Sequence, residues 1–310
     1  MWEGLSMAIK KVALIGMGAM GLLLTSVFSE HMNKEDLRIV ADPNRIERYR
    51  KEPFMVNGKI LDPYFVTSKE MPGAADLAIF AVKYSGLNQA IKDMRNQIDE
   101  HTTIVSVLNG IASEQDLAAA YSPEQVLYMV AQGMDATRKE QSMYYTVKGQ
   151  LAIGKVMPEQ EERYLDLKAF LEEMQYPIEE PEDIRRQMWS KFMFNTGVNQ
   201  VVGVYGGGYG VVQKEGDART QMIRAMEEVL PLAKAEGILL TEDDIQYWLG
   251  VADKMGAEGK PSMLQDIEAG RLNEVELFSG TVRQLAKKHG VAVPINDWLY
   301  SILTQKNQHL

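Results

Sequence analysis

Lys191, Asn195 and Asn199 stand four residues apart in the second half of the chain, a spacing that aligns side chains along one face of a helix. Large apolar neighbours such as Trp189 and Phe192 favour a buried helix. A solvated face would more often carry Glu and Lys than Asn, which is a poor helix former. We therefore interpret the three polar residues as the lining of a cleft between two domains rather than as a solvated helix face.

A second group of residues lies near the start of the chain, where the apolar segment 12–15 runs into the pattern G-x-G-x-x-G. Gly16 allows a tight turn, Gly18 lets a phosphate approach the backbone, and Gly21 lets the next helix pack against the strand. Free N–H groups and the helix dipole favour an anion there. The strand before and the helix after favour nucleotide binding over a glycine-rich turn without a ligand. The predicted cofactor-binding residues are Gly16, Met17, Gly18, Ala19, Met20 and Gly21.

Asp42, Lys83 and Asn109 each follow an apolar segment that is expected to be a strand. Ligands of α/β sheets bind outside the carboxyl ends of the strands. Taken alone, Lys83 also fits a surface lysine, and Asn109–Gly110 also fits an ordinary turn. Their shared edge of the predicted sheet favours contact with a nucleotide.

The chain alternates between strand and helix patterns in its first half and shows helical periodicity almost throughout its second half. Its 310 residues exceed the usual size of one domain. We predict an α/β protein with an N-terminal, doubly wound Rossmann-type domain over residues 7–180 and an all-helical C-terminal domain over residues 181–310. The predicted strands are 12–15, 37–41, 77–82, 103–108, 126–130, 144–147 and 151–153, with a hairpin over 54–61 that turns at Asn57–Gly58. The predicted helices of the second domain lie near 183–203, 217–236, 242–255, 262–269, 273–288 and 294–305.

Local patterns mark several helix ends in the second domain. Thr241 followed by Asp244 resembles a helix N-cap with an acidic first turn. Gly237 and Gly290 suit helix C-termini. No predicted strand precedes the glycine-rich run 206–210, so we interpret it as a flexible helix terminator rather than a phosphate loop.

The composition narrows the class of protein. Hydrophobic residues make up 45% and charged residues 25% of the chain, as in an ordinary soluble protein, and no apolar run approaches the about 20 residues of a membrane span. The absence of Cys excludes disulfides, thiolate metal sites and a cysteine nucleophile, and it suits a reducing cytoplasm. The net charge of −10 argues against a nucleic-acid partner. No metal site is expected, and no histidine lies in a candidate motif.

The N-terminus lacks the basic and long apolar segments of a signal peptide, so we expect a cytoplasmic protein without a membrane anchor. The fold pattern is expected to begin at Met7, with residues 1–6 as a loose extension.

Taken together, these residues resemble the ketopantoate reductase (2-dehydropantoate 2-reductase) family in order and spacing, over nearly the whole chain from about residue 7. The resemblance rests on the glycine motif 16–21, Val82–Lys83, Leu108–Asn109–Gly110, Trp189-x-Lys191-x-x-x-Asn195-x-x-x-Asn199, and Ser262 followed by Glu274. It implies NAD(P)H as the cofactor and a small-molecule 2-oxo acid as the substrate, with a homodimer left open.

The resemblance also implies the catalytic residues. In that family, the lysine matching Lys191 is the general acid for the ketone oxygen, and the glutamate matching Glu274 positions it. Alone, Glu274 reads only as an acidic residue in a first helical turn. Burial would lower the pKa of Lys191 and help it to give up a proton, whereas Glu274 nearby would oppose that shift. The sequence leaves open which effect is larger.

Five further residues match binding positions of the family. The asparagines matching Asn195 and Asn199 hold hydroxyl and carbonyl groups of the substrate. The serine matching Ser262, which alone reads as a helix N-cap, contacts the substrate carboxylate. Lys83 and Asn109 match contacts on the cofactor side and the substrate side, and Asn109 is predicted to serve both.

Asp42 departs from the family pattern. The second strand usually ends in an arginine that pairs with the 2′-phosphate of NADPH. An aspartate accepts hydrogen bonds from ribose hydroxyls and repels a 2′-phosphate, although Arg45 could turn back to offset that repulsion. We therefore expect NADH to be weakly favoured, against the NADPH that the resemblance implies.

Three alternative functions remain open. A 3-hydroxyisobutyrate-type dehydrogenase also has a glycine-rich start, a lysine four residues before an asparagine and a helical second domain. Its lysine usually follows a glycine-rich helix, whereas Trp189–Ser190 precedes Lys191 here. A reductase of another 2-oxo acid would use the same residues. A non-catalytic NAD(P)-sensing module would need no proton donor.

Overall fold

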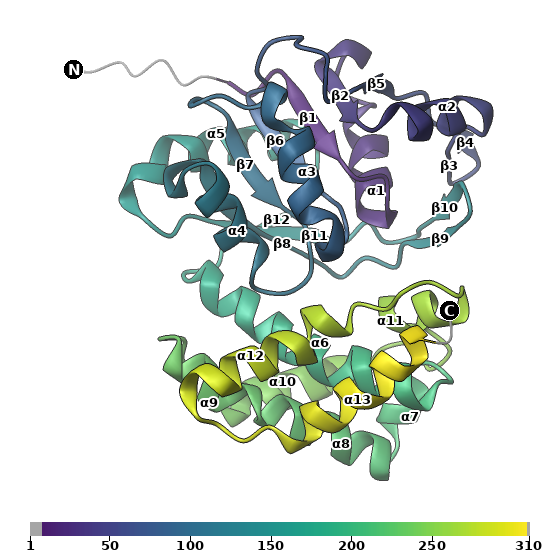
Figure 1. Cartoon of the computed structure of the whole chain (residues 1–310), viewed down its shortest axis with the longest axis vertical. Helices are drawn as coiled ribbons and strands as arrows, with labels where there is room; N and C mark the ends of the chain where they lie inside the picture. Colours follow the sequence, from purple (N-terminus) through teal and green to yellow (C-terminus); the bar gives the residue numbers. More distant parts are fainter. Residues whose placement is uncertain (1–7, 309–310) are drawn as a thin grey trace. The chain divides into compact units, whose positions relative to one another are not determined.

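The computed structural model describes residues 8–308, so the expected start at Met7 and the extension 1–6 lie outside the described residues. The chain divides into two compact units, both drawn in Figure 1. Within the described residues, the N-terminal unit comprises 8–108 and 112–184, and the C-terminal unit comprises 109–111 and 185–308. The segment 109–111 groups with the C-terminal unit although its chain neighbours on both sides group with the N-terminal unit.

An eight-stranded sheet organises the N-terminal unit. Its strands are β1 (Val12–Ile15), β2 (Leu37–Val40), β5 (Tyr64–Val66), β6 (Leu77–Phe80), β7 (Thr103–Ser106), β8 (Val126–Gln132), β11 (Gln150–Gly154) and β12 (Ile178–Glu179). They lie in the order β12-β11-β8-β7-β6-β1-β2-β5, and all neighbours are parallel except β8 and β11. Every residue of β1, β2, β6 and β7 is buried, as expected for parallel strands that are covered on both faces.

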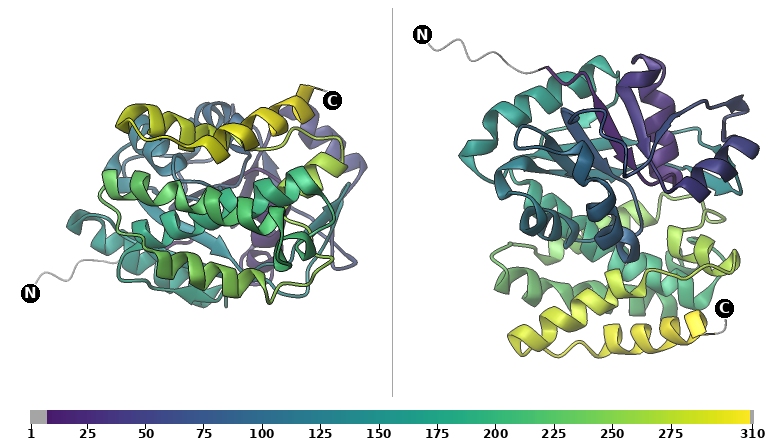
Figure 2. Two further views of the ribbon diagram at one scale, coloured as in Figure 1. Left: turned by 90° about the horizontal axis from the view of Figure 1, so that it is seen from below. Right: turned by 45° about the horizontal axis from the view of Figure 1, so that its top comes forward.

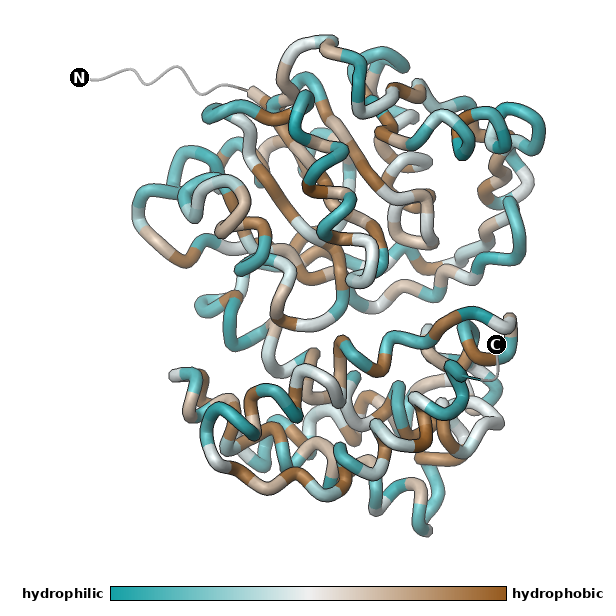
Figure 3. The backbone as a smooth tube through the Cα atoms, in the orientation of Figure 1, coloured by the Kyte–Doolittle hydropathy of each residue, from teal (hydrophilic) through white to brown (hydrophobic). Residues whose placement is uncertain are grey.

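Alternate residues of β1 contribute to two separate cores, one on each face of this sheet. Val12 and Leu14 lie in the core that α1 (Ala19–Phe28) and α5 (Glu161–Glu173) cover, and Ala13 and Ile15 lie in the core that α3 (Leu87–Asp93) and α4 (Ser113–Ala120) cover. Figure 3 shows the hydrophobic colour running along the central strands. This unit also contains the helix α2 (Pro43–Lys51) and the 3-10 turns η1 (Lys34–Asp36), η2 (Tyr84–Gly86), η3 (Arg95–Gln97), η4 (Pro123–Gln125) and η5 (Pro158–Gln160).

A smaller sheet with the order β4-β3-β10-β9 belongs to the same unit. Its strands are β3 (Met55–Val56), β4 (Lys59–Ile60), β9 (Thr137–Lys139) and β10 (Ser142–Tyr144). The predicted hairpin is confirmed: Asn57 and Gly58 have φ of 49° and 79°, as a two-residue hairpin turn requires. The predicted strand 144–147 is wrong. The N–H groups of Thr146 and Val147 donate to the Asp135 side chain, so a side-chain oxygen replaces a strand partner.

Helices build the C-terminal unit, as predicted. They are α6 (Ile184–Tyr205), α7 (Gly210–Gln213), α8 (Asp217–Glu227), α9 (Val229–Ala235), α10 (Glu242–Ala252), α11 (Ser262–Glu268), α12 (Ser279–His289) and α13 (Pro294–Gln308), with the 3-10 turn η6 (Val275–Leu277). Residues 192–203 of α6 are buried without interruption, so this helix forms the core of the unit. Figure 2 shows α12 and α13, in the yellow part of the chain, packed side by side.

Two predicted helices are corrected. The helix predicted over 217–236 is two helices. Pro231 has no N–H to donate to the Glu227 carbonyl, and α8 ends at Glu227. The helix predicted over 273–288 begins only at Ser279. Asn273 holds the preceding segment in place: its side chain accepts from Val275 N–H at 3.1 Å and donates to the Leu303 carbonyl at 3.0 Å.

Buried polar contacts fix the rotation of α6. Gln200, which is fully buried, accepts from the Ser279 N–H at 3.1 Å, and the Ser279 hydroxyl donates to Asn296 at 3.0 Å. These bonds connect α6 with α12 and α13. Over residues 8–308, no helix is both long enough and apolar enough to cross a membrane.

Candidate functional site

The three glycines of the loop between β1 and α1 meet different constraints. Gly16 has φ of +107°, and a Cβ there would lie 2.5 Å from the Ala81 carbonyl. A Cβ at Gly21 would lie 1.8 Å from the Gly16 oxygen, so α1 packs directly on the loop. A Cβ at Gly18 would meet nothing beyond its chain neighbours closer than the Ala81 oxygen at 3.9 Å. The protein itself therefore leaves room at Gly18, as the close approach of a phosphate to the backbone would require.

The start of α1 is open to an anion. Gly18 is the N-cap residue, and within residues 8–308 no side chain caps this helix and no acidic residue lies in its first turn. Its first N–H groups and its dipole therefore face outward without compensation. Met17 is buried, whereas Ala19 and Met20 are partly exposed. These features fit the pyrophosphate of a dinucleotide.

Asp42 and Lys83 lie at the same edge of the sheet as this loop. Ile15 pairs in parallel with Val40 on one side and with Phe80 on the other, so the three chain segments leave the sheet together. Lys83 is exposed and is the N-cap residue of η2, directly after the backbone that contacts Gly16.

Asp42 caps helix α2. Its Oδ1 accepts from the Arg45 N–H at 2.9 Å, and its Oδ2 lies 3.1 Å from the Arg45 Nε. The carboxylate is thus held at the carboxyl end of β2, with a positive charge beside it. Arg45 turns back onto Asp42, and its effect on a 2′-phosphate stays a prediction.

Arg138 is a neighbour of the glycine loop that the sequence analysis missed. This residue of β9 donates from Nη1 to the Met17 carbonyl. The segment around it reads only as a short charged stretch, so no motif marks it. β9 follows β8 in the chain, and β8 ends at the same edge of the sheet as β1. The chain path therefore brings Arg138 close to the glycine loop.

In the C-terminal unit, α6 carries the predicted polar stripe. Asn195 and Asn199 are 9% and 6% exposed, and neither side chain has a hydrogen-bond partner among the described residues. Trp248 of α10 fixes the helix near Lys191: its ring stacks on Phe194 at 4.4 Å, and its Nε1 donates to the Ser190 hydroxyl at 2.8 Å. Two nearly buried amides that have no partner among residues 8–308 are suited to hold polar groups of a ligand.

Lys191 meets Asn109 in this unit. The Lys191 Nζ donates to the Asn109 Oδ1 at 3.2 Å, which joins a residue from the loop after β7 to the head of the stripe. Burial lowers the pKa of Lys191 from 10.5 to about 8. The direction is the one that burial alone predicts. An amine with this pKa is largely protonated at neutral pH and gives up its proton easily.

The residues that follow Glu274 pack close to Asn109 and Lys191. A Cβ at Gly110 would lie 2.6 Å from Leu277 Cδ1, so the Asn109–Gly110 turn packs closely on η6. Phe278 stacks on Phe192 at 6.4 Å, beside Lys191 in the sequence. Glu274 itself is partly buried and is the N-cap residue of η6, not a residue in the first turn of a longer helix.

Ser262 lies toward the other end of the stripe. It is the exposed first residue of α11, and Pro261 takes the N-cap position that the sequence suggested for Ser262. The following residue, Met263, packs on α6 at Gly203, where a Cβ would be 3.2 Å from its side chain. Gly203 is one turn beyond Asn199 on α6, so α11 packs beside the end of the polar stripe.

A largely parallel sheet with a glycine loop that has room for an anion, and a helical unit that presents a lysine of lowered pKa, are the features of a nucleotide-dependent oxidoreductase. Residues 12–158 match the family model described as ketopantoate reductase PanE/ApbA, and residues 183–307 match the model of the C-terminal part of that family. The chain belongs to the ketopantoate reductase family. It is an NAD(P)H-dependent oxidoreductase that acts on a small molecule, and the family resemblance seen in the sequence is confirmed.

Known relatives cover nearly the full chain. The 2-dehydropantoate 2-reductase of Salmonella typhi is 24% identical over 300 residues, which span 96% of this chain and 95% of the relative. The structure of 2-dehydropantoate 2-reductase from Geobacter metallireducens matches with a TM-score of 0.84 at 22% identity, covering 95% of this chain and 99% of that one. D-mandelate dehydrogenase, solved with NADH and anilino(oxo)acetate, matches with a TM-score of 0.87 at 21% identity, covering 96% and 98%.

Proposed function

We propose that this chain is a 2-dehydropantoate 2-reductase, which reduces the ketone of ketopantoate to the alcohol of pantoate. The observation that carries the proposal is the position of Lys191. Its amine is desolvated and bonded to Asn109, and it lies at the head of a stripe of two amides that have no partner within the described part of the chain. This donor set suits a small acid that bears a ketone and a hydroxyl group.

The nicotinamide of NAD(P)H supplies the hydride that adds to the ketone carbon. Negative charge then develops on the ketone oxygen, and the ammonium of Lys191 stabilises it and transfers a proton to it. Asn109 orients the amine through its Oδ1. In this proposal Glu274 positions Lys191 from the N-terminus of η6.

The remaining polar residues hold the two ligands. We assign Asn195 and Asn199 to the hydroxyl and carbonyl groups of the substrate and Ser262 to its carboxylate. Lys83 and the loop 16–21 bind the cofactor, and Asn109 contacts cofactor and substrate.

We propose that NADH is preferred over NADPH. Asp42 is held at the end of β2 by its bonds to Arg45, where a carboxylate favours ribose hydroxyls over a 2′-phosphate. Arg45 reduces the repulsion of the phosphate, so a preference is expected rather than exclusion.

A substrate panel tests the proposed function. Initial rates are measured with ketopantoate, phenylglyoxylate and pyruvate, each with NADH and with NADPH, and in the reverse direction with 3-hydroxyisobutyrate. The proposal expects the highest kcat/KM for ketopantoate. Efficient oxidation of 3-hydroxyisobutyrate without turnover of ketopantoate would contradict it, and binding of NADH without any turnover would favour a sensing module. Light scattering in the same buffer checks whether the chain forms a homodimer.

A further inference from the structure

The smaller sheet of the N-terminal unit brings an arginine to the cofactor loop. Arg138 is the central residue of β9, and its Nη1 donates to the carbonyl of Met17, between the first two glycines of the motif. Its Nε donates to the Glu140 carbonyl at 2.7 Å, and its Nη2 donates to Gln141 Oε1 at 3.3 Å. The guanidinium is therefore held in one orientation against the loop.

This contact places a positive charge where the loop receives an anion. A guanidinium is ionised at every pH at which the protein is folded. Met17 directly precedes Gly18, the N-cap of α1, at which the protein leaves space for a ligand. The charge and the helix N-terminus therefore act in the same direction on a phosphate.

Buried aromatic rings hold the arginine in place. The Arg138 Cζ lies 5.5 Å from the ring centroid of Phe54, which is 1% exposed, and Phe54 packs on Tyr49 at 4.6 Å. Tyr49 belongs to α2, the helix that Asp42 caps. Because this stack fixes the guanidinium before a ligand binds, little side-chain entropy is lost on binding.

We propose that Arg138 is a cofactor-binding residue, whose guanidinium pairs with the diphosphate of the dinucleotide at the loop that it braces. The proposal rests on the use of NAD(P)H and not on the identity of the 2-oxo acid. It gives the smaller sheet a role in binding, because β9 delivers a cation that the glycine motif lacks.

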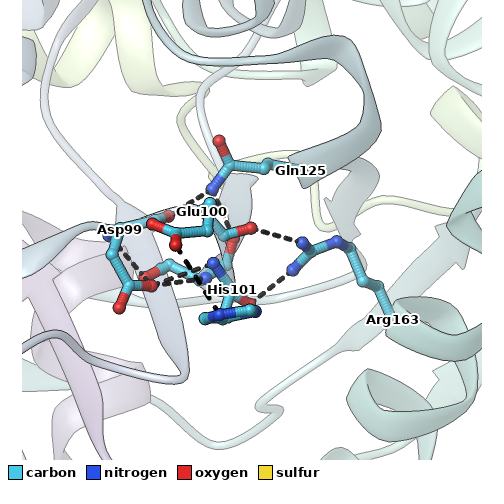
Figure 4. Close-up of polar contacts among 6 residues, drawn as sticks. Asp99, Glu100, His101, Gln125 and Arg163 are labelled. Atoms are coloured by element: carbon cyan, nitrogen blue, oxygen red, sulfur yellow. Dashed lines mark hydrogen bonds and ion pairs between the residues drawn. The ribbon is translucent and has the colours of Figure 1, made fainter.

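Arg163 provides a matched control in the same unit. It also donates to two main-chain carbonyls, those of Glu100 (2.7 Å) and His101, but this loop follows η3 and precedes β7. Figure 4 shows the Arg163 guanidinium facing the backbone of Glu100 and His101, with Asp99 on the opposite side of these two residues. Replacing either arginine by Met removes hydrogen bonds from a guanidinium to backbone carbonyls, but only Arg138 lies at the glycine loop.

The experiment compares the full-length wild type with Arg138→Met, Arg138→Lys and Arg163→Met. Binding of ADP-ribose is measured by calorimetry, and binding of adenosine by saturation-transfer NMR. Thermal melting reports the stability of each variant. Loss of a charge-assisted bond predicts that Arg138→Met binds ADP-ribose about 10- to 100-fold more weakly, with adenosine binding unchanged. Arg138→Lys should recover part of the loss, and Arg163→Met should bind both ligands as the wild type does.

Two results would overturn the proposal. One is wild-type affinity of Arg138→Met for ADP-ribose. The other is an equal loss of ADP-ribose and adenosine binding, which would make Arg138 a brace of the loop only. Failure of the wild type to reduce ketopantoate would contradict the proposed function alone, because ADP-ribose binding is measured without substrate.

Discussion

The two units use different parts of the chain for their chemistry. In the N-terminal unit, the candidate anion site consists of backbone N–H groups at the start of α1 and the free space at Gly18, and Arg138 lies beside it. In the C-terminal unit, the candidate site consists of polar side chains on a helix whose core-facing residues are buried, so its geometry depends on how packing fixes that helix. The lowered pKa of Lys191 exists only because α6 is buried. Local sequence can therefore specify the glycine loop, whereas Arg138 beside it and the site of the C-terminal unit depend on the tertiary fold.

The largest effect is expected at Lys191. Lys191→Ala removes the proposed general acid and should lower kcat by about 10²–10⁴-fold, with the Kd for NADH unchanged. Lys191→Arg keeps a positive charge but cannot release a proton near neutral pH, so it should not restore kcat. Rapid-mixing kinetics and a nucleotide titration check both parts. Near-normal turnover of Lys191→Ala would make this residue structural.

The glycine loop offers a matched pair of substitutions. Gly21→Ala would place a Cβ 1.8 Å from the Gly16 oxygen and should lower the free energy of unfolding by about 3 kcal/mol. Gly18 has φ of −75°, which alanine tolerates, and its Cβ would have free space. Gly18→Ala should therefore keep wild-type stability and weaken NADH binding. Denaturant unfolding and calorimetry separate the two; strong NADH binding by Gly18→Ala would argue against a phosphate at this point.

Several features of the fold could be predicted from local sequence. The turn after β1, the Asn57–Gly58 hairpin and the extent of α6 follow from glycines and apolar periodicity. The Thr241 cap is also confirmed, because the Thr241 N–H donates to the Asp244 carboxylate at 2.8 Å. Each depends on residues that are close in the sequence.

The failures depend on distant residues. The strand predicted over 144–147 does not form there, because the N–H groups of Thr146 and Val147 donate to Asp135. The helix predicted from residue 273 begins later, because the Asn273 side chain donates to a carbonyl of α13. Arg138 reaches Met17 across 121 positions of the chain. The roles assigned to the site residues stay predictions, although the structure brings Lys191 and Asn109 together.

A buried acid in the N-terminal unit contrasts with the buried amine of the C-terminal unit. Glu114 is 1% exposed, and burial raises its pKa from 4.5 to about 7. Its Oε2 accepts from the Ser113 hydroxyl at 3.0 Å, and its Oε1 has no partner among the described residues. Between pH 4.5 and 7 the folded chain keeps a proton that the unfolded chain releases, so stability falls as the pH rises.

Glu114→Gln should remove this pH dependence. The free energy of unfolding of the wild type should fall by up to about 3 kcal/mol from pH 5 to pH 8 because of this group. The variant should not show this part of the fall. Urea unfolding at the two pH values measures the difference. Parallel pH curves for wild type and variant would show that Glu114 ionises normally in the folded state.

The smallest expected effect concerns the choice of cofactor. Asp42→Arg should raise kcat/KM for NADPH relative to NADH by about tenfold, which corresponds to about 1.4 kcal/mol. Asp42→Asn is the matched control, because asparagine retains the cap of α2 but carries no charge. It should shift the ratio in the same direction by less. A wild type that already favours NADPH tenfold would contradict the preference and point to Arg45 as the phosphate partner.

The pH profile of ketopantoate reduction tests the role of Lys191 most directly. A general acid must be protonated, so kcat/KM is expected to be level below pH 8 and to fall tenfold per pH unit above it, since the pKa of Lys191 is about 8. The Kd for NADH, measured over the same range, separates proton donation from cofactor binding. The residual activity of Lys191→Ala should lack the break at pH 8. A wild-type profile that stays level to pH 10 would contradict the account.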